Sequence, residues 1–122
     1  MSIGIAYQKF GTDMEKQQEV MMGISDMVME SFAMESSWLR SCKLAASGKR
    51  TNAGDMCAVF LRCAMDRIEC SARAVVGACS TVDSLPENMQ VLRSLAVYDP
   101  IDAVRLRRTI ANRLLADGRY NI

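Results

Sequence analysis

Two charged side chains interrupt apolar patterns that have helical spacing in this sequence. Glu35 lies within one such run of apolar residues, and Arg67 lies within the next. Burying either charge alone would be costly, whereas a hydrogen-bonded ion pair can be accommodated inside a protein. We therefore predict an ion pair between Glu35 and Arg67 inside the fold, with Arg107 as the reserve partner.

The predicted pair has a functional and a structural interpretation. In the first, Glu35 is a catalytic base; in the second, the pair fixes how two helices align. A general base normally works with other titratable groups, but the chain has no histidine and no second inward carboxylate. We favour the structural interpretation, and the sequence predicts no catalytic, cofactor-binding or metal-binding residue.

Arginines gather toward the C-terminus, at Arg105, Arg107, Arg108, Arg113 and Arg119. A cluster of guanidinium groups can hold phosphate or the nucleotide end of a coenzyme. No glycine-rich phosphate-binding motif accompanies the cluster. Phosphate contact by Arg105, Arg108 and Arg113 is therefore the minority interpretation, beside a solvated face that answers the acidic residues of the first long helix.

The composition indicates one soluble domain in a reducing compartment. The chain has 122 residues, 50% of them hydrophobic, and a formal net charge of +1, so no strong field attracts nucleic acid or an anionic membrane. The five cysteines form no Cys-x-x-Cys pair, and their odd number fits a disulfide framework poorly. With no signal peptide and no apolar run that could span a bilayer, we expect a cytoplasmic protein without a membrane anchor.

Residues 1–11 differ from the rest of the chain. Ile3, Ile5 and Tyr7 alternate with small or polar residues, which is a strand-like period. We predict an extended arm or linker over 1–11, leading from an upstream domain. The remaining residues, 12–122, are predicted to form the folded domain.

Capping signals divide residues 12–122 into four predicted helices. The first runs from the capping box at Thr12 to about Ser47, and the second from Asp55 to about Ser80. A short third helix opens at Ser84, and a fourth opens at Asp99-Pro100 and ends near Gly118. The fold class is therefore all-α, an antiparallel up-and-down four-helix bundle.

Folding the first two helices about the loop at 48–54 predicts which residues face each other. Glu35 meets Arg67, and Met27 meets Val75. Helical spacing predicts the inward stripe of the first helix. It consists of Val20, Met21, Ile24, Met27, Val28, Met34, Trp38, Leu39, Cys42 and Ala45.

The first helix carries a second set of small residues and methionines on the side opposite its main stripe. The set is Met22, Ser25, Met29, Ala33 and Ser36. We interpret this side as an interface with a partner; the alternative is an ordinary exposed face, since scattered surface apolar residues are common. The acidic residues Glu19, Asp26 and Glu30 lie between the two sides and are predicted to be solvated.

The stretch from Glu19 to Arg40 resembles the C-terminal helical extension of acyl-CoA dehydrogenases, of the bacterial long-chain and very-long-chain mitochondrial types. Its most specific part is Phe32-Ala33-Met34-Glu35-Ser36, followed by Leu39-Arg40. The close of the chain is also similar, with Ile110-Ala111 and then Gly118-Arg119-Tyr120. The resemblance covers about residues 12–122.

The resemblance implies a role rather than a reaction for this chain. In the family, an upstream core oxidises acyl-CoA to 2-enoyl-CoA with FAD and a glutamate base, and passes electrons to an electron-transferring flavoprotein. The segments that carry this chemistry have no counterpart here, so the chain alone is expected to be inactive and without cofactor. Its implied role is packing on the core and supporting a homo-oligomer.

Two other functions stay open from the sequence. One is a freestanding helical module for protein–protein interaction, using the side that carries Met22 and Met29. The other is a small autonomous enzyme or metal protein, which the absence of histidine argues against.

Overall fold

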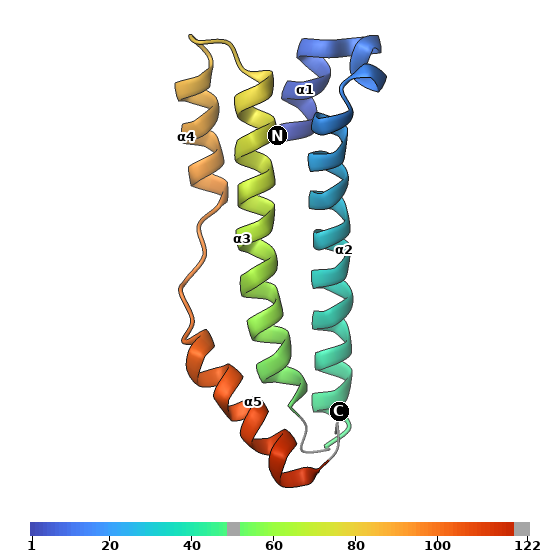
Figure 1. The fold of residues 1–122 in the computed structure, drawn as a ribbon, viewed down its shortest axis with the longest axis vertical. Coiled ribbons are helices and arrows are strands. Elements are labelled where there is room, and N and C mark those ends of the chain that lie inside the picture. The colour runs from blue at the N-terminus through green and yellow to red at the C-terminus, as the bar shows by residue number, and fades with distance from the viewer. Residues whose placement is uncertain (49–51, 119–122) are drawn as a thin grey trace. The chain divides into compact units, whose positions relative to one another are not determined.

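The computed structural model describes residues 1–48 and 52–118, and within these ranges every regular element is helical (Figure 1). The elements in chain order are α1 Ser2–Phe10, the 3-10 helix η1 Gly11–Lys16, α2 Gln18–Ala46, α3 Ala53–Cys79, α4 Leu85–Leu95 and α5 Ala103–Asp117. The all-α class is confirmed. The long helices α2 and α3 and the short α4 correspond to the first three predicted helices.

The chain divides into two compact units, each built from two stretches of sequence. The first unit comprises Met1–Ser31 and Met65–Tyr98, and the second comprises Phe32–Ala64 and Asp99–Ile122. The helices α2 and α3 therefore contribute residues to both units. Each unit is described separately below.

The predicted extended arm is wrong, because residues 1–11 form α1 and the start of η1. Alternation over so few residues is a weak signal, and tertiary burial overrides it. In the helix, Ser2 and Ala6 lie one turn apart on a buried side, and Ala6 packs in a cluster with Val20 and Val75. The Lys9 ammonium group donates a hydrogen bond to the carbonyl oxygen of Ala78 at 2.7 Å, which ties the end of α1 to α3.

The capping signals in the sequence predict some helix ends correctly and others incorrectly. The capping box at Thr12 falls inside η1, and α2 begins only at Gln18. For α5 the cap is Asp102 rather than Asp99, since the Asp102 Oδ1 accepts a hydrogen bond from the Arg105 amide at 2.9 Å. The predicted stop at Gly118 is confirmed: this glycine has a φ of 60° in the left-handed region.

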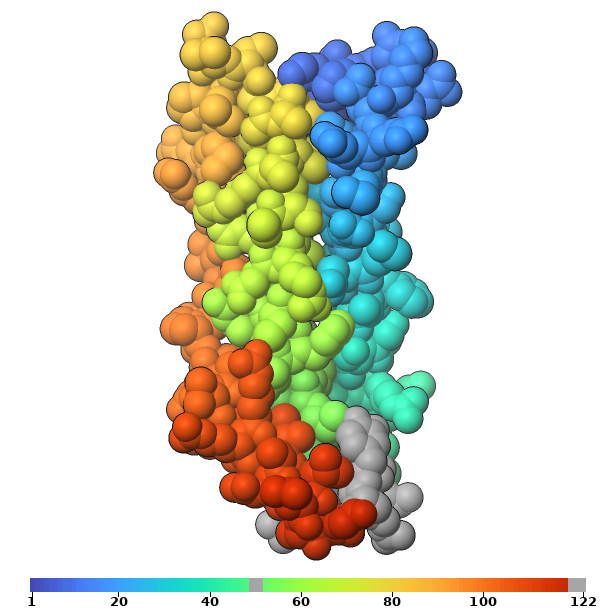
Figure 2. All heavy atoms as spheres, viewed as in Figure 1, coloured from blue at the N-terminus to red at the C-terminus, as the bar shows by residue number. Residues whose placement is uncertain are grey.

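The core of the first unit forms where α3 packs against α2 on one side and α4 on the other (Figure 1). Val76 is fully buried, and it clusters with Ala72 of the same helix and Leu92 of α4. The atoms of α4 lie directly against those of α3 in the space-filling view (Figure 2). This packing gives the first unit a continuous apolar interior.

The second unit has far less apolar interior. Among the residues that the structure describes, Cys57 and Ala64 are its buried apolar side chains. Its other buried residue is polar: the Asn52 Oδ1 accepts a hydrogen bond from the Arg113 guanidinium at 2.7 Å. Arg113 also lies 3.6 Å from the Asp55 carboxylate, so polar contacts connect α5 to the start of α3.

The predicted register of α2 against α3 is wrong by about one helical turn within the first unit. A side chain at Gly23 would lie 3.0 Å from the Val75 methyl group, where the sequence placed Met27. Helix α3 begins two residues earlier than the predicted cap at Asp55, which moves the centre of the hairpin. Because a shift of one turn keeps the same helix sides in contact, the apolar pattern cannot detect this error.

Candidate interaction surface

Helix α2 exposes large apolar side chains in the first unit. Met22 and Met29, both predicted at an interface, are 63% and 61% exposed, and Ser25 between them is exposed as well. Met21 and Val28 were predicted to face inward, but both are exposed in this structure. The inward side is narrower than predicted and consists mainly of Val20 and Ile24.

The part of α2 in the second unit is equally apolar on its surface. Phe32 is 72% exposed, and Trp38 and Leu39 are exposed although the sequence placed them inside. Of the predicted interface residues here, Ser36 is exposed and Ala33 is half-buried. A helix that carries apolar residues on its exposed side as well as on its buried side is typical of one that another protein surface covers.

A groove between α2 and α3 lies beside this surface in the first unit. Its volume is about 410 Å³, and Met22, Asp26, Cys70 and Ala74 are among its lining residues. Gly23 also lines it, at the point where an added methyl group would lie a tight 3.0 Å from the Val75 side chain. The groove continues into a second hollow that Asp26 and Cys70 also line, next to the Glu30–Arg67 pair.

Arg67 binds Glu30 within the first unit. Its Nε and Nη2 both donate to the Glu30 carboxylate, with Nη2 and Oε2 2.9 Å apart. The hydrogen bond from Arg67 lowers the pKa of Glu30, against an opposing effect of desolvation. The sequence predicted a solvated Glu30, but its carboxylate is hydrogen-bonded to Arg67. The sequence also placed Arg67 inside the fold, yet 49% of its side chain is exposed.

The predicted partner of Arg67, Glu35, is an exposed residue of the second unit. The Glu35–Arg67 pair stays a prediction. The charge of Arg67 is already balanced by the Glu30 carboxylate. The reserve partner, Arg107, has its Nη2 3.2 Å from the Cys63 sulfur within the second unit.

A polar cluster that the sequence did not indicate anchors the end of the first unit. The Tyr98 hydroxyl lies within hydrogen-bond distance of the carboxylates of Asp66, at 3.0 Å, and Glu69, at 2.9 Å. Arg73, one turn after Glu69, also donates to that carboxylate, and the two hydrogen bonds lower the pKa of Glu69. Desolvation, followed by the hydrogen bonds to Glu69 and Asp66, raises the pKa of Tyr98. Only the Glu69–Arg73 spacing could have been found in advance, because it is an ordinary helical i,i+4 pair.

The three arginines predicted to contact phosphate do not converge on one site. Arg113 is occupied by Asn52 and Asp55, and the Arg105 Nε lies 3.9 Å from Asp102. Arg108 is exposed one turn after Arg105 on α5. Phosphate contact stays a prediction, and Arg119 of the same cluster lies outside the described residues.

The model of the family described as "Acyl-CoA dehydrogenase, C-terminal domain" matches residues 1–94, which include all of α2 and its exposed apolar side. The chain belongs to this family. It is similar to a probable acyl-CoA dehydrogenase of Bacillus subtilis (strain 168), with 30% identity over 122 residues, covering 98% of this chain and 20% of the relative.

A solved relative agrees with this assignment. The crystal structure of acyl-CoA dehydrogenase complexed with FAD from Bacillus anthracis matches with a TM-score of 0.94 and 32% identity. The match covers 100% of this chain and 22% of that chain. The resemblance to the acyl-CoA dehydrogenase family is thus confirmed, and the chain spans about a fifth of the length of these two relatives.

Within residues 1–48 and 52–118, no three histidine, cysteine, aspartate or glutamate side chains are grouped as metal ligands would be. None of the helices in these ranges has the length and apolar character that crossing a bilayer requires.

Proposed function

We propose that this chain is a non-catalytic helical domain that packs on the core of an acyl-CoA dehydrogenase-like flavoenzyme. The observation that carries the proposal is the exposed apolar side of α2, at Met22, Met29 and Phe32, in a chain that belongs to this family. Water-exposed apolar area of this kind is stabilised when another protein surface covers it.

The proposal extends to the whole enzyme. The parent protein oxidises acyl-CoA to 2-enoyl-CoA, binds FAD in its core and transfers electrons to an electron-transferring flavoprotein. The solved relative, which is complexed with FAD, supports the cofactor. The domain itself is an up-and-down four-helix bundle, and it supports a homo-oligomer. Its free cysteines suit the reducing cytoplasm.

The first test is the size of the native polypeptide in its source cells, measured by immunoblot with an antibody to this chain. The proposal predicts a band several times heavier than 13.5 kDa. A band at 13.5 kDa would contradict it.

The second test asks whether the exposed side of α2 binds the core. In the native polypeptide, Met29→Lys should lower the thermal stability of the flavin-loaded protein and reduce its oligomeric state, because it would bury a charge. The matched control is Val82→Lys, which changes an exposed apolar residue of the turn before α4. Equal behaviour of the two variants would exclude α2 as the contact surface.

A freestanding interaction module is the second candidate, and the exposure of Met22 and Met29 favours it equally. The two functions differ in their partner. If the native chain is small, and if Met29→Lys abolishes its self-association, the module replaces the domain of a flavoenzyme as the best description.

A further inference from the structure

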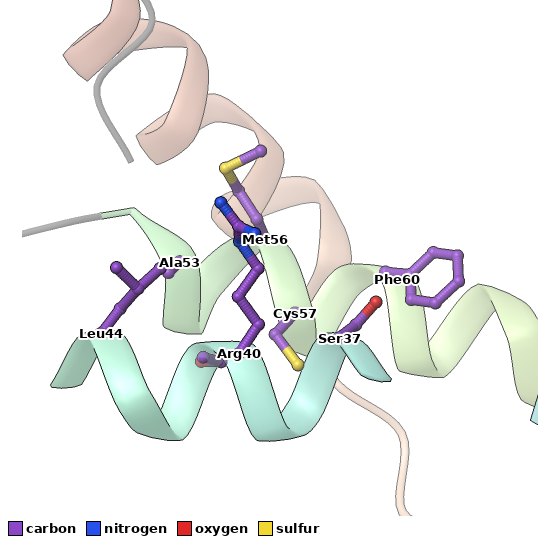
Figure 3. A pocket seen from close by; sticks show the side chains of 8 residues that line it. Ser37, Arg40, Leu44, Ala53, Met56, Cys57 and Phe60 are labelled. Atoms are coloured by element: carbon purple, nitrogen blue, oxygen red, sulfur yellow. The ribbon is translucent and has the colours of Figure 1, made fainter. Parts of the chain in front are cut away.

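A cavity of about 240 Å³ opens between α2 and α3 within the second unit. Its walls are mainly apolar, with Leu44 on α2 and Met56 and Phe60 on α3 (Figure 3). Cys57 also lines it and is almost completely buried. The cavity is smaller than those that hold drug-sized ligands, so it suits a small molecule.

The Cys57 thiol keeps its side of the cavity uncharged. Burial raises the pKa of this thiol, and the neighbouring Ser41 hydroxyl opposes the effect only in part. At neutral pH the group is therefore a neutral, weakly polar surface. An aliphatic chain can contact such a surface without displacing strongly held water.

Among the described residues that line this cavity, Arg40 is the one cationic side chain. In Figure 3 its side chain extends from α2 toward α3, and Met56 of α3 lines the same cavity. Within the described residues Arg40 makes no ion pair, whereas Arg67 and Arg113 each bind a carboxylate. The cavity also borders Ala53, the first residue of α3, where the helix dipole is positive and favours an anion.

We propose that this cavity binds a straight-chain aliphatic carboxylate, with its carboxylate on Arg40 and its alkyl tail between Leu44 and Phe60. The volume corresponds to roughly eight water-sized groups, which sets a tail of roughly six to eight carbons. A single planar guanidinium matches a singly charged carboxylate in a two-bond geometry. This site is separate from the exposed side of α2, and the inference does not depend on the proposed function.

A ligand series on the isotope-labelled 122-residue chain tests the chemistry. Octanoate should shift the backbone amide NMR signals of residues 37–44 and 53–60 in a saturable way. Acetate carries the charge without the tail, and octylammonium carries the tail with the opposite charge, so both should bind at least tenfold more weakly. Equal binding of octanoate and octylammonium would show a general apolar gap and overturn the proposal.

Two variants locate the charge that is responsible. Arg40→Gln should weaken octanoate binding by about tenfold, the loss expected for one charge-assisted interaction. The matched control is Lys43→Gln, which removes a cation of the same helix that does not line the cavity and should leave binding unchanged. Both positions are exposed, so neither change should unfold the chain, and circular dichroism checks this. Identical losses in the two variants, or signal shifts concentrated around Met22 and Met29, would refute the site.

Discussion

The two units of this domain are held together in different ways, although both use the same pair of long helices. In the first unit α1 and α4 add to α2 and α3, and residues such as Ala6, Val76 and Leu92 become buried. In the second unit α5 is the additional helix, and its contacts to α3 include the polar ones of Arg113 with Asn52 and Asp55.

The difference shows that apolar composition alone does not produce a core. The second unit contains Phe32, Trp38 and Leu115, yet all three are largely exposed. Apolar side chains stabilise a fold only when a second surface removes them from water. We infer that the first unit is stable by its own burial, whereas the second depends more on polar contacts and on a covering partner.

The largest expected effect comes from matched leucine truncations in the two units. Leu92→Ala should destabilise the first unit by about 2–4 kcal/mol, because Leu92 is only 6% exposed and its loss leaves a cavity. Leu115→Ala, at a residue that is 80% exposed, should change stability by less than about 0.5 kcal/mol. Urea unfolding measures both. Similar losses of stability would show that Leu115 is buried and that α5 contributes apolar side chains to a core.

The second effect tests the polar contact of the second unit. Asn52→Ala should cost about 1–2 kcal/mol, because it removes a buried acceptor from the Arg113 guanidinium. Amide hydrogen exchange should report the loss chiefly in α5. If protection instead falls in α1 and α4, the two units are not energetically separable.

Two glycines provide a smaller, internally controlled comparison within the first unit. Gly77→Ala should stabilise the chain by roughly 0.5–1 kcal/mol, since the new methyl group meets no atom within 4 Å and alanine favours the helix. Gly23→Ala gains the same preference but places its methyl group 3.0 Å from Val75, so the net gain should be smaller or absent. Thermal unfolding distinguishes them, and an equal gain would show that α2 and α3 separate easily here.

The smallest effect decides which carboxylate is the partner of Arg67. A double-mutant cycle with Glu30→Gln and Arg67→Met should give a larger coupling than the same cycle with Glu35→Gln. Because the pKa of Glu30 is lowered below its ordinary value of 4.5, its contribution is present above that pH and is lost as the pH falls through the folded-state value. Glu30→Gln should remove part of the acid sensitivity. A stronger coupling for Glu35 would restore the original prediction.

Several features of this protein follow from its sequence alone. The all-helical class, the long helices α2 and α3, the stop at Gly118 and the family could all be recognised, because they depend on local spacing and on nearby residues. Exposure of Met22 and Met29 was also predicted. These signals need no knowledge of what lies across the fold.

Only the tertiary structure decided the register of α2 against α3, the helix over residues 2–10 and the pairing of Arg67 with Glu30. Sliding two helices by one turn leaves the same sides in contact, so the apolar pattern fits both alignments, and packing at Gly23 decides between them. The short N-terminal segment is helical because Ala6 packs into the core, which its own alternation does not reveal. Which apolar side chains are covered is likewise a property of the neighbouring surfaces and not of the local sequence.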